Sequence, residues 1–301
     1  MNPTRQVRII VCLFYFGLAS LITGCKTIDS TAVSNFAASV TDVKSQADDA
    51  LNATAALTRD ASVRYAASQP TLAEANFVKT PTDETITEWD GALTTIETYA
   101  QNLSTLLSPD AAKDFDVAAT NLFNQFNQTA GRLNANRMNS QAGVNALLAT
   151  AFTQTADAII QAKEQATAVK IAAATDSQIT KILSLLANEI GADRATPGLR
   201  RTVYEAVWTP RLANLSASFL TTTNFADKLA LSQQYADMLA QRDAQDQLLT
   251  GLRQSLLALS DAHHALAQGK PASIPADLAV VAGEIQHTRE LYSQFSNTTK
   301  Q

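Results

Sequence analysis

Apolar residues recur along most of this chain at alternating steps of three and four, the spacing that places them on one face of an α-helix. The pattern is clearest near the start of the polar region, where it forms a seven-residue repeat. Such a repeat is typical of a helix packed along a straight seam, and alanines at its centre let a partner helix approach closely. The seam comprises Val33, Phe36, Val40, Val43, Ala47, Ala50, Thr54, Leu57 and Ala61.

Proline and glycine signals divide the rest of the pattern into further helices. Gln69-Pro70 ends the first helix, because a residue before proline avoids the α conformation. After a linker in which Phe77 and Val78 are expected to fold back onto the bundle, a second helix begins near residues 82–84. Ser108-Pro109-Asp110 ends that helix and starts the next, since Ser caps and Pro suits a first helical position.

The second half of the chain predicts two very long elements. Residues 140–190 carry one apolar stripe, which would make a rod of roughly 75 Å if unbroken. An interruption, if present, is expected at residues 173–177. Gly191 and Thr196-Pro197-Gly198 close this element, and the helix that follows must kink or break at Pro210. Another long helix is expected over residues 224–268, and Pro275 opens a last one.

These elements together predict an all-α fold, an elongated bundle of long antiparallel helices with heptad-like seams. No stretch alternates in the manner of a strand. We expect one bundle domain over residues 32–296 and a frayed tail at residues 297–301.

The first residues of the chain have a different pattern from the helices. Arg5 and Arg8 precede an apolar core, Ile9–Ile22, which is shorter than the roughly 20 residues that span a bilayer. Ile22-Thr23-Gly24-Cys25 follows and resembles the lipobox of bacterial lipoproteins. The resemblance implies a signal peptide at residues 1–24, acylation of Cys25, and a short tether at residues 25–31. The alternative is an ordinary secretory signal with an incidental cysteine.

Composition and charge agree with an exported protein that does not bind nucleic acid. The two cysteines are Cys12 and Cys25, so an acylated Cys25 leaves no disulfide available. The net charge of −5 offers nothing to a phosphate backbone. Lys26 stands where the best-known inner-membrane retention signal has an aspartate. If the source has two membranes, we therefore expect the periplasmic face of the outer membrane.

Two pairs of acid and histidine have the spacing of a dinuclear metal site in a bundle, Asp261 with His264 and Glu284 with His287. In an antiparallel hairpin that turns near Pro271, the two histidines differ in level by roughly nine residues, about 13 Å of rise. No metal site is predicted, and we interpret His264, His287 and the adjacent His263 as surface or rim residues.

Four arginines gather around the proline breaks, interleaved with Tyr204 and Trp208: Arg194, Arg200, Arg201 and Arg211. Basic residues beside aromatic rings can contact an anionic ligand such as a lipid headgroup or an acidic glycan. The alternative is that they cap and solvate helix ends. Trp89 and Trp208 are expected to be core anchors.

Motifs for nucleophilic catalysis and phosphate binding are missing from the sequence, and no cofactor is predicted. The leading hypothesis is a lipid-anchored, non-enzymatic protein of a bacterial envelope that acts as a scaffold, accessory or inhibitor through contacts with an envelope or secreted protein. The alternative is a periplasmic module that binds a lipid or other apolar ligand. Pore formation would require a mature segment apolar enough to insert, and none is present.

Overall fold

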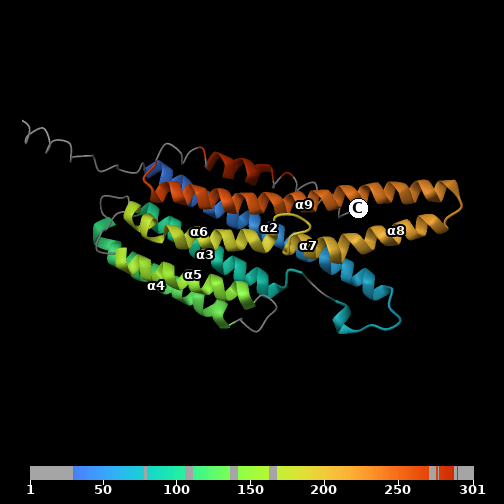
Figure 1. The fold of residues 1–301 in the computed structure, drawn as a ribbon, viewed down its shortest axis with the longest axis horizontal. Coiled ribbons are helices and arrows are strands. Elements are labelled where there is room, and N and C mark those ends of the chain that lie inside the picture. The colour runs from blue at the N-terminus through green and yellow to red at the C-terminus, as the bar shows by residue number, and fades with distance from the viewer. Residues whose placement is uncertain are drawn as a thin grey trace, which may run out of the picture.

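A computed structural model describes residues 30–77, 80–105, 111–135, 142–162, 168–270, 276, 278–287 and 290. It confirms the all-α, elongated bundle, and no strand occurs in these ranges (Figure 1). The named helices are α2 (Ser30–Ala67), α3 (Asp83–Thr105), α4 (Ala111–Ala135), α5 (Ala142–Ala162), α6 (Ala168–Ile190), α7 (Leu199–Val203), α8 (Thr209–Thr221) and α9 (Phe225–Ala267), with short helical turns η2 (Glu74–Asn76) and η4 (Tyr204–Trp208). Residues 278–287 are also helical.

The core lies where the long helices run side by side. α2 packs on α3 and on α9, α6 packs on α9 and α5, and α4 packs on α5. One continuous apolar cluster joins these helices. Phe126 and Phe152 contact each other across α4 and α5 with ring centroids 5.5 Å apart. Because these helices bury their faces against several neighbours, this part of the molecule holds the main core.

The seam expected in the first helix is buried from Val33 to Leu57, and Ala61 at its end is half-buried. Ala47 and Ala50 have no exposed surface, and α3 and α9 both pack on α2. Thr54 is equally buried, and its hydroxyl donates to the Ala50 carbonyl at 2.7 Å, so this polar group needs no partner outside its own helix. The small side chains at the centre of α2 therefore set how closely its neighbours approach.

Residues 140–190 are not one unbroken rod, because two helices share this stretch, and the interruption falls before residues 173–177. α5 ends at Ala162 and α6 begins at Ala168, and the two helices pack against each other. α6 also continues through residues 173–177, where an interruption was expected. Thr175 is buried there, and its hydroxyl donates to the Ile171 carbonyl at 2.8 Å.

Pro210 is accommodated without a break in the helix. α7, η4 and α8 follow one another directly, and η4 is a π-turn with one more residue per turn than an α-helix. In it the Thr209 N–H donates to the Tyr204 carbonyl, five residues earlier. Pro210 comes immediately afterwards, at the start of α8, and the wider π-turn supplies the local change in helix geometry that a proline, which lacks an N–H, requires.

The linker before α3 also differs in one detail from what the sequence predicts. Phe77 remains 48% exposed and does not cover the core, and Val78 lies outside the described residues. The linker is held instead through its backbone, because the Thr80 N–H donates to the Thr58 hydroxyl at 2.9 Å.

α8 and the first half of α9 form an arm, residues 209–244, that extends past the bundle (Figure 1). None of its residues is buried, since α8 has no buried residue and those of α9 begin at Gln245. The arm turns at residues 222–224. The beginning of α2, at Ser30, lies at the opposite end of the molecule (Figure 1).

Candidate functional site

Large apolar side chains are exposed around the turn of the arm. Leu220 and Phe225 are each 79% exposed, the highest values among the large apolar residues that the structure describes. Leu229 is 49% exposed and Phe219 is 37% exposed. The Lys228 ammonium lies 4.9 Å from the centre of the Phe219 ring, a cation–π contact between the two helices.

The polar groups of this turn are bonded within the turn itself. Asn224 caps α9, because its side-chain oxygen accepts the Ala226 N–H at 2.8 Å. The Thr222 N–H and hydroxyl both donate to the Ser218 carbonyl, at 3.1 and 2.8 Å. Thr221 donates its hydroxyl to the same carbonyl at 3.0 Å. The turn is therefore shaped by local bonds and not by contact with the bundle.

A buried ion pair fixes the base of the arm. The Arg200 guanidinium binds Asp246 through two parallel bonds of 2.9 Å, and it also donates to the Ala192 carbonyl. Arg200 is 8% exposed. Trp208 is buried close by and its indole N–H lies 3.4 Å from the Gln245 side-chain oxygen. These contacts hold α7 and η4 against residues 245 and 246 of α9, where the arm begins.

The other three arginines of the predicted cluster also have carboxylate partners within the chain. Arg194 contacts Asp243 at 2.8 Å and Asp246 at 3.3 Å. Arg201 pairs with Glu205, one turn along, at 2.8 Å. Arg211 pairs with Asp60 of α2, and its guanidinium lies 5.8 Å from the centre of the Trp208 ring. These geometries are those of helix junctions, and contact with an anionic ligand stays a prediction.

A chain of hydrogen bonds crosses the bundle interior from α3 to α6 and α9. The Tyr99 hydroxyl lies 2.7 Å from the Thr175 hydroxyl and 2.8 Å from His263 Nε2. His263 Nδ1 is 3.1 Å from one Asp176 oxygen, and His264 Nδ1 is 2.6 Å from the other. An ionised Asp176 accepts a hydrogen bond from His263 Nδ1–H. His263 Nε2 then carries no proton and accepts a hydrogen bond from the Tyr99 hydroxyl.

Burial and hydrogen bonding shift the pKa values of this network in physically consistent directions. Hydrogen bonds from His263 and His264 lower the pKa of Asp176. Burial lowers the pKa of His263, and the Asp176 carboxylate opposes part of that shift. Burial also raises the pKa of Tyr99. The network therefore holds one carboxylate, one neutral imidazole and one phenol at neutral pH, and it joins three helices.

The interpretation of His263 as a surface or rim residue is wrong, because its side chain has no exposed surface. His264 is 53% exposed and His287 is exposed, as expected. Within the described ranges, no group of three or more His, Cys, Asp and Glu side chains is placed to hold a metal ion. The two acid–histidine spacings do not converge: His264 bonds to Asp176 of α6 instead.

A second carboxyl group, that of Glu189, is half-buried at the end of α6. The Trp89 indole N–H donates to Glu189 Oε2 at 2.6 Å. Burial raises the pKa of Glu189 to about 7, and the Trp89 hydrogen bond only partly offsets that effect. Trp89 is 4% exposed and belongs to the core, as its sequence position predicts.

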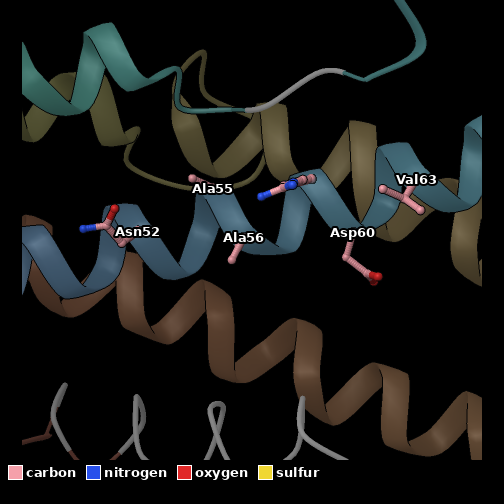
Figure 2. Close-up of a pocket in the computed structure, with 6 residues that line it drawn as sticks. Asn52, Ala55, Ala56, Asp60 and Val63 are labelled. Carbon is pink, nitrogen blue, oxygen red and sulfur yellow. The ribbon is translucent and has the colours of Figure 1, made fainter. Parts of the chain in front are cut away.

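An open pocket of about 360 Å³ lies on α2 beside the base of the arm (Figure 2). Its described lining comes from about three turns of α2. The lining is mixed, because small apolar side chains alternate with an amide and two charged groups: Asn52, Ala55, Ala56, Arg59, Asp60 and Val63. Asp60 pairs with Arg211 of the arm, so the pocket and the arm share one ion pair.

Comparisons with known proteins give no relatives. No family model matches the chain, and neither a curated protein nor a solved structure is similar to it. Cys25 and the signal segment lie outside the described residues. No helix in the described part of the chain is long and apolar enough to cross a membrane.

Sequence reasoning missed the arm and the two buried polar contacts, although some signals were present. His263 follows Leu256 and Leu259 at the apolar spacing and precedes Leu266, which places it on the buried face of α9. No local pattern indicates its partner Asp176, 87 residues away. The exposure of Leu220 and Phe225 has no signal in the sequence, since the same residues next to another helix would be core.

Proposed function

We propose that this protein is a lipid-anchored, non-enzymatic component of a bacterial envelope that works by contact with another protein, as a scaffold, accessory or inhibitor. The observation that carries the proposal is the arm, residues 209–244. A helical hairpin held outside the core leaves nearly all of its surface available to a partner. A fold that only had to be stable would bury that surface.

The flank of the arm has the composition of a contact surface. Tyr235 is 37% exposed there, between glutamines and one acid. Tyrosine is enriched among the residues that dominate binding energy in protein interfaces, because it combines apolar area with a hydroxyl. The base of the arm supports this role, since the Arg200–Asp246 pair keeps the flank in a fixed orientation.

Attachment to the membrane is supported by the resemblance of Ile22-Thr23-Gly24-Cys25 to a lipobox. Cys25 stands five residues before the first described helix residue, Ser30, a reach of at most about 18 Å. An acylated Cys25 would therefore hold the bundle next to the bilayer. With Lys26 following the cysteine, the periplasmic face of the outer membrane is the proposed location in a source with two membranes.

The alternative, a module for a lipid or other apolar ligand, requires an apolar cavity. The pocket on α2 exposes Asn52, Arg59 and Asp60 to any occupant, which does not suit such a ligand. The arm supports protein contact better.

Site-specific crosslinking tests the contact. A photo-reactive amino acid replaces Tyr235 in the full chain, in its own host, and a matched variant carries it at Val117, which is 62% exposed on α4. We expect a discrete protein adduct from position 235 and none from position 117. Equal yields at both positions, or none at either, would contradict the proposal.

Fractionation tests the anchor separately. Wild-type chain labelled with radioactive palmitate is expected in the membrane fraction, and Cys25→Ser should lose the label. One acyl chain gives marginal binding, whereas the two or three chains implied by the resemblance give lasting attachment. An unlabelled, freely soluble wild-type chain would mean that the lipobox is a coincidence.

A further inference from the structure

The end of the arm combines exposed apolar side chains with a lack of charge. We call residues 212–226 the tip; this stretch contains no Asp, Glu, Lys, Arg or His. Leu220 and Phe225 project from it at 79% exposure. The first charges on either side are Arg211, which is paired with Asp60, and Asp227 with Lys228.

Hydrogen bonding prepares the tip for a medium without water. Hydroxyl groups of Ser218, Thr221 and Thr222 donate to backbone carbonyls one turn earlier, and Asn224 accepts a backbone N–H. In lipid every polar group needs an internal partner, and Ser and Thr reach one in this way.

We propose that the tip inserts into the surface of the same lipid bilayer that holds Cys25, as a second point of attachment. A bilayer interior penalises charged side chains, and the tip has none. The chain has a net charge of −5, so electrostatic attraction to anionic lipids does not explain membrane contact, and the apolar side chains must supply it. Lys228, beside Phe219, can extend its ammonium to the headgroup phosphates.

The short distance along the chain from Cys25 to Ser30 favours insertion of the tip into the bilayer that holds Cys25. α9 has 43 residues, so the tip lies about 65 Å from the end of the molecule at which Ser30 stands. The five residues from Cys25 leave that end close to the membrane, so the molecule can lie along the surface with both ends attached. This inference rests on the proposed lipid anchor, which makes insertion of the tip intramolecular and therefore effective even when it is weak.

Fluorescence quenching tests the inference on the full, lipidated chain. Phe225→Trp places a reporter at the tip, and Val117→Trp places one at an exposed position of the bundle; Trp89 and Trp208 are buried in both variants. Each protein is reconstituted into phosphatidylcholine vesicles with brominated acyl chains. We expect blue-shifted, quenched emission from position 225 and unquenched emission from position 117. Adding Leu220→Asp to Phe225→Trp should remove the quenching while the protein still floats with the vesicles.

Each other outcome overturns a defined part of the inference. A Phe225→Trp protein that floats without quenching overturns insertion of the tip and leaves the anchor intact. If the emission of Phe225→Trp is quenched and the vesicles cluster, the tip inserts into a second bilayer and not into the one that holds Cys25. Blue-shifted emission without quenching assigns it to a protein or to a second copy, which crosslinking from position 225 distinguishes. Failure of both variants to float overturns the anchor and, with it, attachment to the same bilayer.

Discussion

The two halves of α9 share one uninterrupted helix, but only one of them lies in a core. From Gln245 to Ala267 the helix buries a leucine stripe against α2 and α6, whereas from Phe225 to Ala244 no residue is fully buried and Met238 only packs partly against the cluster around Trp208. The arm half also has apolar residues at helical spacing, including Leu229 and Leu239. The difference teaches that the periodic pattern specifies a helix, while the number of neighbouring helices determines whether its stripe becomes core.

This contrast also explains how the arm depends on the bundle. Isolated helices are marginal in water, because packing supplies most of their stability. The arm has one helix pair and no buried residue, so it depends on the continuation of α9 into the bundle and on the contacts around Arg200 and Trp208. The bundle half has no such dependence.

The largest effect is expected at the base of the arm. Arg200→Ala leaves Asp246 without its bidentate partner, and breaking a buried pair in this way costs about 3–5 kcal/mol of unfolding free energy. Arg201→Ala is the matched control, since its pair with Glu205 is exposed and contributes less than about 1 kcal/mol. Urea denaturation measures both. Equal losses would show that the ion pair does not hold the base.

The contrast between the halves of α9 predicts unequal costs for the same substitution. Leu256→Ala removes a fully buried side chain and should cost about 2–5 kcal/mol. Leu229→Ala removes one that is 49% exposed on the arm and should change stability by about 0.5 kcal/mol or less. Thermal unfolding of both variants checks the prediction, and comparable losses would place the arm in the cooperative core.

Titration of Glu189 tests the bundle without touching the arm. Its pKa is raised from 4.5 to about 7, so folding loses stability as pH rises through that window. Glu189→Gln keeps an acceptor for Trp89 and removes the charge. We expect the variant to be more stable than wild type by up to about 3 kcal/mol at pH 8, and equal to it below pH 4.5. A constant difference across this range would contradict the shifted pKa.

The smallest effect is expected from overpacking the seam of α2. Ala47→Leu forces bulk between α2 and its neighbours and should cost about 1–3 kcal/mol. Ala56→Leu, on the exposed face of the same helix, is the control and should be nearly neutral. If Ala47→Leu also leaves the melting temperature unchanged, α2 does not pack as closely as its alanines indicate.

Sequence patterns predicted helix ends well at Gln69-Pro70 and at the Asn224 cap, but not at Pro210, where the helix continues through a π-turn. α2 ends at Ala67, just before Gln69-Pro70, and Asn224 caps α9 within the expected range 224–268. These signals are local, because a cap or a proline acts within one turn. Ser108-Pro109-Asp110 lies outside the described residues.

The same patterns failed where the deciding contact was remote. The sequence between α5 and α6 contains no proline or glycine. The only signal there is a gap in the apolar spacing, from Ala162 to Val169. Arg200 was assigned to a possible anion contact, and its partner Asp246 lies 46 residues away. Pairing over such distances follows from the packing of whole helices, which no local spacing encodes.

The π-turn at Tyr204–Trp208 has a rotational consequence for the arm. The π-turn takes up one residue more than an α-turn. If the same residues formed an ordinary α-helix, every residue of α8 would stand about 100° further around the axis, since an α-helix has 3.6 residues per turn. The half-buried apolar residues of α8, Leu212 and Leu215, owe the direction in which they face to the turn that takes up that extra residue. Deleting Ala206 would remove the extra residue together with the π-turn, so α8 would keep Leu212 and Leu215 facing the same way. The orientation of the arm is therefore tied to a residue count in the helix backbone at its base, where the Thr209 hydroxyl also donates to the Tyr204 carbonyl.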